Sequence, residues 1–119
     1  MSKTRTITLT NAPPVRIAED KWPIVAEAKW YEGEHECQAN RTAAIRVREH
    51  DDGRRIVYGV AITNWAKESN RHAGVLLDAD GSFHEAMTHV VAAIHAVAAK
   101  IGHEHLADEC IADLPPVDL

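Results

Sequence analysis

The stretch Ile45-Arg-Val-Arg-Glu-His-Asp-Asp-Gly-Arg-Arg-Ile-Val-Tyr-Gly-Val60 contains a turn between two runs of alternating residue types. The turn is Asp51-Asp-Gly-Arg54, and Asp-Gly between two such runs is typical of a β-hairpin. The pattern predicts one strand over Thr42–His50 and a returning strand over Ile56–Ile62. We therefore expect the chain to be built around an antiparallel sheet.

The two faces of this hairpin are expected to differ in chemistry. Successive side chains of a strand point to opposite sides, so Ile45 and Val47 share one face and Arg46 and Arg48 share the other. In the returning strand, Gly59 leaves one face thin, which indicates that another element packs closely there. We expect the face with the arginines to be uncovered.

Four further segments have extended patterns. Thr4–Thr10 alternates threonine with larger side chains and predicts a half-buried strand, and Val15–Ile17 predicts a short extended piece. Ile24–Tyr31 also alternates; its Ala, Glu and Lys favour a helix, but the period of two favours a strand. Val75–Leu77 predicts a short edge strand, and the polar stretch 63–73 before it predicts a loop.

Two helices are predicted in the last third of the chain. The first spans residues 82–101: it begins with the capping box Ser82-Phe-His-Glu85, continues with apolar residues at helical spacing, and ends at Gly102. A second, shorter helix is predicted over residues 104–112, before a pair of prolines that cannot continue it.

Strands followed by helices predict an α+β fold. We expect a single domain over residues 1–119, in which an antiparallel sheet of three to four strands lies within residues 4–77. One long helix and a short C-terminal helix are expected to cover one face of this sheet. The exposed edge of a strand at Thr4–Thr10 would allow a homodimer.

Length and composition limit the class of protein. A chain of 119 residues can bury a core without a disulfide or a metal. No apolar run is long enough to span a membrane, and the first six residues are polar. Cys37 and Cys110 do not form the disulfide framework of a secreted domain. We expect a soluble, cytoplasmic protein with reduced thiols and no cofactor.

Charge is distributed unevenly. Residues 1–77 contain 12 Lys and Arg and 10 Asp and Glu, whereas residues 78–119 contain Lys100 against eight acids. Such an acidic segment argues against nucleic acid as its partner and would complement a basic protein surface. The alternative is that these acidic residues only keep a small protein soluble. Trp22 and Trp65 lie next to turns and are expected to be exposed. Trp is enriched at the hot spots of protein interfaces, so both are candidates for partner binding. The acidic candidates for partner binding are Glu104, Asp108, Glu109 and Asp113.

Histidine and cysteine residues raise the question of a metal. Phe83-His-Glu-Ala-Met-Thr-His89 is one residue longer than the zinc-protease signature H-E-x-x-H, so its two histidines point in different directions from a helix and cannot share an ion. A zinc-stabilised protein is a separate alternative, because imidazoles and thiols bind zinc tetrahedrally. Its ligands would come from His35, Cys37, His103, His105 and Cys110.

Nucleic-acid binding is the other alternative. Arginines cluster on the predicted hairpin near Tyr58, and arginine with an aromatic can bind a phosphate backbone. Glu49, Asp51 and Asp52 interrupt this cluster, and the chain has no RNA-binding sheet motif. In this alternative the protein is a small regulator that binds nucleic acid through Arg46, Arg48, Arg54 and Arg55.

Several stretches over most of the chain resemble small proteins encoded in phages and prophages of proteobacteria. They are Pro13-Pro-Val-Arg-Ile17, Trp22-Pro23, Gln38-Ala-Asn-Arg41, Arg46-Val-Arg48, Asp52-Gly-Arg54, Tyr58-Gly-Val60 and Glu109-Cys-Ile-Ala-Asp-Leu-Pro115. The resemblance implies no active-site residues. It implies a context in which small acidic proteins inhibit host machinery, as anti-CRISPR proteins do. The leading expectation is a non-enzymatic inhibitor whose partner is a host protein complex such as a CRISPR–Cas effector.

Overall fold

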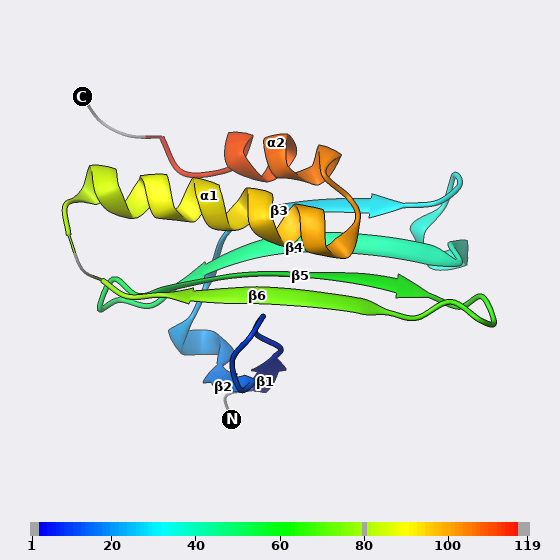
Figure 1. Cartoon of the computed structure of the whole chain (residues 1–119), viewed down its shortest axis with the longest axis horizontal. Helices are drawn as coiled ribbons and strands as arrows, with labels where there is room; N and C mark the ends of the chain where they lie inside the picture. Colours follow the sequence, from blue (N-terminus) through cyan, green and yellow to red (C-terminus); the bar gives the residue numbers. More distant parts are fainter. Residues whose placement is uncertain (1–2, 80, 117–119) are drawn as a thin grey trace.

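The computed structural model describes residues 3–79 and 81–116; the remaining residues of the predicted 1–119 domain lie outside the described part. Four strands form an antiparallel sheet in the order β3-β4-β5-β6, and β1 and β2 pair in a separate two-stranded sheet (Figure 1). The elements are β1 (Thr4–Ile7), β2 (Val15–Ala18), β3 (Ile24–Tyr31), β4 (Arg41–Glu49), β5 (Arg55–Thr63), β6 (Arg71–Leu77), α1 (Phe83–Ile101) and α2 (His105–Ala112), with 3-10 turns at Glu19–Lys21 and Glu36–Gln38.

The predicted α+β class and the central hairpin are confirmed. β4 and β5 pair in register from Arg41 opposite Thr63 to Glu49 opposite Arg55, closed by the predicted Asp-Gly turn. Gly53 in that turn has a φ of +95°, a conformation that favours glycine. The strand prediction for Ile24–Tyr31 is confirmed over the same residues.

Three expectations need correction. The segment predicted as Thr4–Thr10 forms a strand only over Thr4–Ile7, and it pairs with β2 outside the main sheet. β6 begins at Arg71 and not at Val75, because the ladder with β5 extends over residues 71–74, which form no apolar run in the sequence. Helix α1 has 19 residues, so the expectation of one long helix is matched only roughly.

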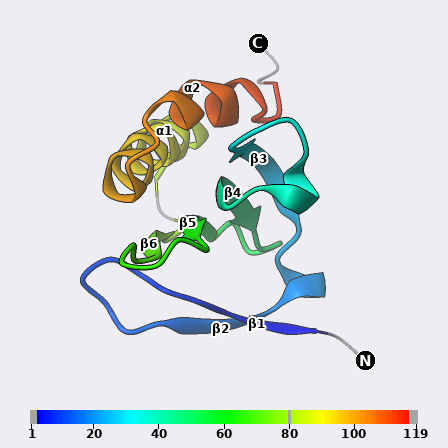
Figure 2. The ribbon, with the colours of Figure 1, turned by 90° about the vertical axis from the view of Figure 1, so that its right-hand side faces the viewer.

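Both helices lie on the same face of the four-stranded sheet (Figure 2). Val90, Ile94 and Val97 from the apolar stripe of α1 belong to the main hydrophobic core. Ile45 and Val47 of β4 belong to the same core. α1 passes very close to β5: a Cβ added to Gly59 would lie 2.7 Å from Cγ1 of Val97. The thin face predicted at Gly59 is therefore the place where α1 crosses the sheet.

The opposite face is partly covered, against expectation. The β1–β2 hairpin lies across it (Figures 1 and 2) and forms a second apolar cluster with β5. Gly74 admits the connection between β1 and β2, because a Cβ there would lie 2.5 Å from the carbonyl oxygen of Thr8. The backbone N–H of Thr10 then donates to the Gly74 carbonyl at 2.8 Å. The cluster consists of Ile7, Ile17, Trp22, Ile56 and Tyr58.

Among the described residues, no helix combines the length and the apolar character that a membrane crossing requires. α1 is the longer of the two helices, and its sequence includes His84, Glu85, His89, His95 and Lys100.

Candidate functional site

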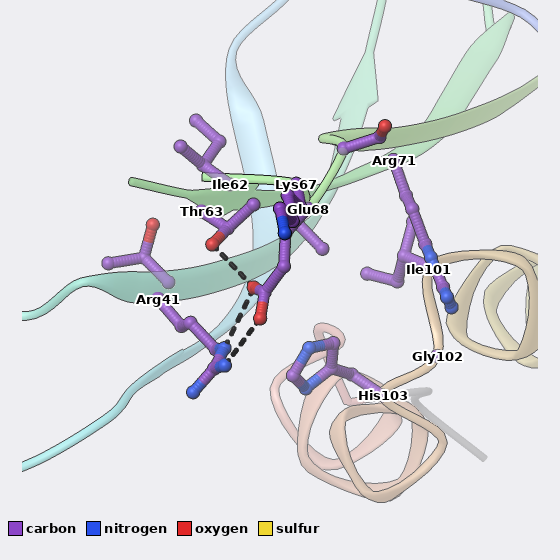
Figure 3. A pocket seen from close by; sticks show the side chains of 12 residues that line it. Arg41, Ile62, Thr63, Lys67, Glu68, Arg71, Ile101, Gly102 and His103 are labelled. Atoms are coloured by element: carbon purple, nitrogen blue, oxygen red, sulfur yellow. Dashed lines mark hydrogen bonds and ion pairs between the residues drawn. The ribbon is translucent and has the colours of Figure 1, made fainter. Parts of the chain in front are cut away.

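A hollow of about 560 Å³ opens at one end of the main sheet. Its walls come from the start of β4, the end of β5, the connection 64–70, the start of β6 and the residues that follow α1 (Figure 3). The connection 32–40 after β3 belongs to the same end of the sheet (Figure 1). We call this part of the molecule, defined by residues 32–40, 64–70 and 102–104, the loop end.

A network around Glu68 forms one wall of the hollow (Figure 3). Arg41 donates from two guanidinium nitrogens to both carboxylate oxygens of Glu68, with the Nε bond at 3.0 Å, and the Thr63 hydroxyl donates to Glu68 at 2.6 Å. Arg41 also donates to Glu32. The bonds from Arg41 and then from Thr63 lower the pKa of Glu68 to about 2, because hydrogen bonds to a carboxylate favour its charged form.

The opposite wall contains His103, in the turn between the helices. Its ring packs on Trp30, with 4.8 Å between ring centroids, and lies 5.6 Å from the ring of His105. Burial, then His105 and Arg71, lower the pKa of His103. A lowered pKa favours the neutral imidazole, which can donate one hydrogen bond and accept another.

Large apolar side chains are exposed at the loop end and at the strand ends next to it. Trp65 is 48% exposed, as predicted, and the guanidinium carbon of Arg41 lies 5.7 Å from the centroid of its ring. Tyr31 on β3 and Ile62 on β5 are also exposed, and both stand opposite Thr42 of β4. Sequence reasoning missed these two, although each falls at the end of a strand that continues into a polar loop.

Trp22 is not exposed. It is 7% exposed and packs in the second apolar cluster, so the expectation of a surface Trp at this turn is wrong. The turn before Pro23 folds beneath the sheet, where the Trp22 carbonyl accepts a hydrogen bond from Arg48 at 2.9 Å and the guanidinium of Arg54 lies 5.1 Å from the centroid of the Trp22 ring. A partner cannot reach most of this side chain.

The four hairpin arginines are occupied within the protein. Arg48 is 5% exposed and Arg55 is 9% exposed, so neither belongs to an open face. Each of the four has a carboxylate within ion-pair distance, which neutralises the cluster that the sequence presented as a surface for nucleic acid. The pairs are Arg46–Glu27 at 3.0 Å, Arg48–Glu19 at 3.7 Å, Arg54–Asp52 at 2.8 Å and Arg55–Glu49 at 3.1 Å.

The acidic candidates behave differently from one another. Glu104, Asp108 and Glu109 are exposed and form no ion pair with any residue in the described part of the chain. Asp113 instead accepts a hydrogen bond from the backbone N–H of Glu27 at 2.9 Å. Asp113 thereby satisfies an outward-pointing donor on edge strand β3, which is a structural role.

The zinc alternative is not supported. Within residues 3–79 and 81–116, no three His, Cys, Asp or Glu side chains are placed to hold one ion. Cys110 of α2 is fully buried, and burial raises the pKa of its thiol to about 11, whereas Cys37 is exposed in the connection after β3. His35 is exposed near Cys37, and His103 and His105 contact Trp30, so the five predicted ligands are not brought together.

Comparison of the chain with protein-family models, with curated proteins and with solved structures gave no match.

Proposed function

We propose that the protein is a non-enzymatic, phage-encoded binding protein that inhibits a host defence complex of the CRISPR–Cas kind. In this proposal the exposed face of α2 docks on a basic protein surface that otherwise binds nucleic acid. The docked protein excludes the nucleic acid by occupying its place.

The observation that carries the proposal is a segregation of charge. The hairpin arginines are neutralised by acids of the same domain, whereas Glu104, Asp108 and Glu109 face solvent without a cationic partner among the described residues. Residues 102–116 contain no Lys or Arg. The molecule therefore presents an uncompensated negative surface that is formed mainly by one helix.

Such a surface favours a basic partner for two physical reasons. Complementary charge accelerates encounter and disfavours partners of like charge. The effect acts over about 8 Å at physiological salt, so carboxylates on one short helix act on the partner together. Trp65 at the loop end provides an exposed aromatic side chain of the kind found at interface hot spots.

A comparison of two charge variants in a capture experiment tests the proposal. The first variant is Glu104→Gln/Asp108→Asn/Glu109→Gln, which neutralises α2. The control is Asp20→Asn/Asp51→Asn/Asp78→Asn, which removes the same charge from exposed residues outside α2 and the loop end. Each tagged protein is incubated with a nuclease-treated lysate of a proteobacterium with an active CRISPR–Cas system, and the retained proteins are identified by mass spectrometry.

The proposal predicts that wild type and control retain subunits of a CRISPR–Cas complex in stoichiometric amount and that the α2 variant does not. Equal retention by both variants would contradict the role of α2. Retention seen in a parallel untreated lysate but not in the nuclease-treated one would favour a nucleic-acid partner instead.

A further inference from the structure

The hollow at the loop end has an excess of positive charge in its lining. The charged residues that line it are the cations Arg41, Lys67 and Arg71 and the anion Glu68. The protein as a whole has a net charge of −5. Arg41 is already occupied by Glu68 and Glu32. Lys67 and Arg71 form no ion pair with any described residue, so two positive charges in this cavity lack a counter-charge from that part of the chain.

The two cations are positioned by separate elements. Lys67 has a φ of +72°, which is rare for a residue with a long side chain, and it lies in the tight connection that also supplies Glu68. Arg71 begins β6 and reaches along the end of α1 (Figure 3), where a Cβ on Gly102 would lie 2.7 Å from its Nη1 atom. Gly102 therefore leaves room for the Arg71 guanidinium, and the partial negative charge at the helix C-terminus favours it there.

Hydrogen-bonding groups complete the walls. The ring of His103 lies across the hollow from the 64–70 connection (Figure 3). The carboxylate of Glu68 faces the same space, but two bonds from Arg41 and one from Thr63 already satisfy it. The lining thus combines two available cations with the imidazole of His103.

We propose that this hollow binds a small molecule bearing a phosphate monoester, with Lys67 and Arg71 as the charge partners of the phosphate. A phosphate monoester carries close to two negative charges at neutral pH, which matches the two cations. The planar guanidinium of Arg71 suits two oxygens of one phosphate, and the Lys67 ammonium acts as a point charge. The cavity, at about 560 Å³, also holds the group to which the phosphate is attached. This inference goes beyond the docking of α2 and does not depend on it.

Amide chemical shifts of the full-length protein test the site. ¹⁵N-labelled protein is titrated with AMP, inorganic phosphate, adenosine and citrate. We expect saturable shifts for AMP and inorganic phosphate that are centred on Lys67, Ser69, Arg71 and His103, and none for adenosine. AMP binding more tightly than phosphate would show that the attached group is also recognised. Shifts that do not saturate, shifts elsewhere, or equal binding of citrate would overturn the proposal.

Substitutions separate the site from non-specific attraction. Because charged hydrogen bonds contribute most in such sites, Lys67→Ala and Arg71→Ala are each expected to weaken AMP binding about tenfold or more. Arg71→Lys keeps the charge and should restore only part of the affinity. Arg16→Ala removes one charge from an exposed residue of β2, outside the lining, and should leave binding unchanged. Equal losses in Arg71→Ala and Arg16→Ala would overturn the proposal.

The titration of His103 gives an independent readout. Several charged or titratable groups lie near this ring. The ring of His105 on α2 is next to it. The charged residues that line the hollow with His103 are Arg41 of β4, Lys67 and Glu68 of the 64–70 connection, and Arg71 of β6. An anion between Arg71 and His103 offsets the repulsion that lowers the pKa of His103. Saturating AMP should therefore raise that pKa, measured from the ring proton shifts. An unchanged pKa would contradict an anion at this position.

Discussion

The two faces of the four-stranded sheet differ in what covers them and in how charge is handled there. The helix face is a continuous apolar layer in which Ile45 and Val47 meet α1. The opposite face is covered over one half by the β1–β2 hairpin, where buried Arg48 lies beside Tyr58, and is open over the other half, around Thr42 and Ile62. Packing on the helix face is stabilised by the burial of apolar area. Packing on the other face also requires that each buried polar group forms a hydrogen bond.

The largest expected effect is on the helix face. Ile45 has no solvent exposure and packs in the main core. Ile45→Ala should lower the free energy of unfolding by about 2–5 kcal/mol, because it removes buried methyl groups and leaves a cavity. Urea denaturation of wild type and variant measures this loss. A loss below about 1 kcal/mol would mean that the helix face is not the main core.

Arg48 tests whether the opposite face depends on polar partners. Its guanidinium donates to the hydroxyl of Tyr58 at 2.8 Å and to the carbonyl of Trp22, and it lies near Glu19. Arg48→Ala leaves these groups unpaired, so we expect about 2 kcal/mol less stability in the same urea experiment. Arg54→Ala, which removes a more exposed arginine, is the matched control and should cost clearly less. Equal small losses would show that Arg48 behaves as a surface residue.

Asp113 sharpens the comparison at the edge of the sheet. Its carboxylate accepts the N–H of Glu27 at 2.9 Å, and the bond is partly offset because an acid is unfavourable at the C-terminal end of α2. Asp113→Ala should cost about 0.5–1 kcal/mol and should speed hydrogen exchange at the Glu27 amide. Asp108→Ala, on the exposed side of α2, should leave hydrogen exchange at the Glu27 amide unchanged. Unchanged exchange at Glu27 would exclude this role for Asp113.

The smallest expected effect concerns Glu68 at the loop end. Its folded-state pKa of about 2 lies below the ordinary value of 4.5, so the network with Arg41 contributes stability above pH 4.5 and loses that contribution as pH falls from 4.5 through about 2. The carboxyl carbon shift of Glu68 should titrate with a midpoint near pH 2. Arg41→Ala should move that midpoint toward 4.5. A wild-type midpoint near 4.5 would exclude the network in solution.

The sequence was sufficient to predict the elements whose side-chain period is unambiguous. The Asp-Gly turn with alternation on both sides predicted β4 and β5, and the capping box with an apolar stripe predicted α1. α2 was expected over residues 104–112 and spans His105–Ala112. Long-range pairing was not predictable in the same way. Nothing local to Thr4–Thr10 indicates that this segment turns back on β2 and crosses beneath the sheet.

The candidate site was predicted less completely than the fold. Trp65, Glu104, Asp108 and Glu109 are exposed as an interface requires, but Trp22, Arg48 and Arg55 are buried. The alternation of β4 correctly put Arg46 and Arg48 on one face, yet it carries no information on whether another element covers that face. The hollow was missed because its charged lining comes from three segments, each of which alone has the pattern of an ordinary polar loop or strand end.

A plaque assay tests the central claim of inhibition through α2 most directly. Proteobacterial strains that each express one type of CRISPR–Cas system with a phage-targeting spacer are infected in the presence of wild type, the α2 variant Glu104→Gln/Asp108→Asn/Glu109→Gln, or the control variant Asp20→Asn/Asp51→Asn/Asp78→Asn. The proposed function predicts that wild type and control restore plaques in at least one strain and that the α2 variant does not. Absence of restoration in every strain, or full activity of the α2 variant, would contradict it.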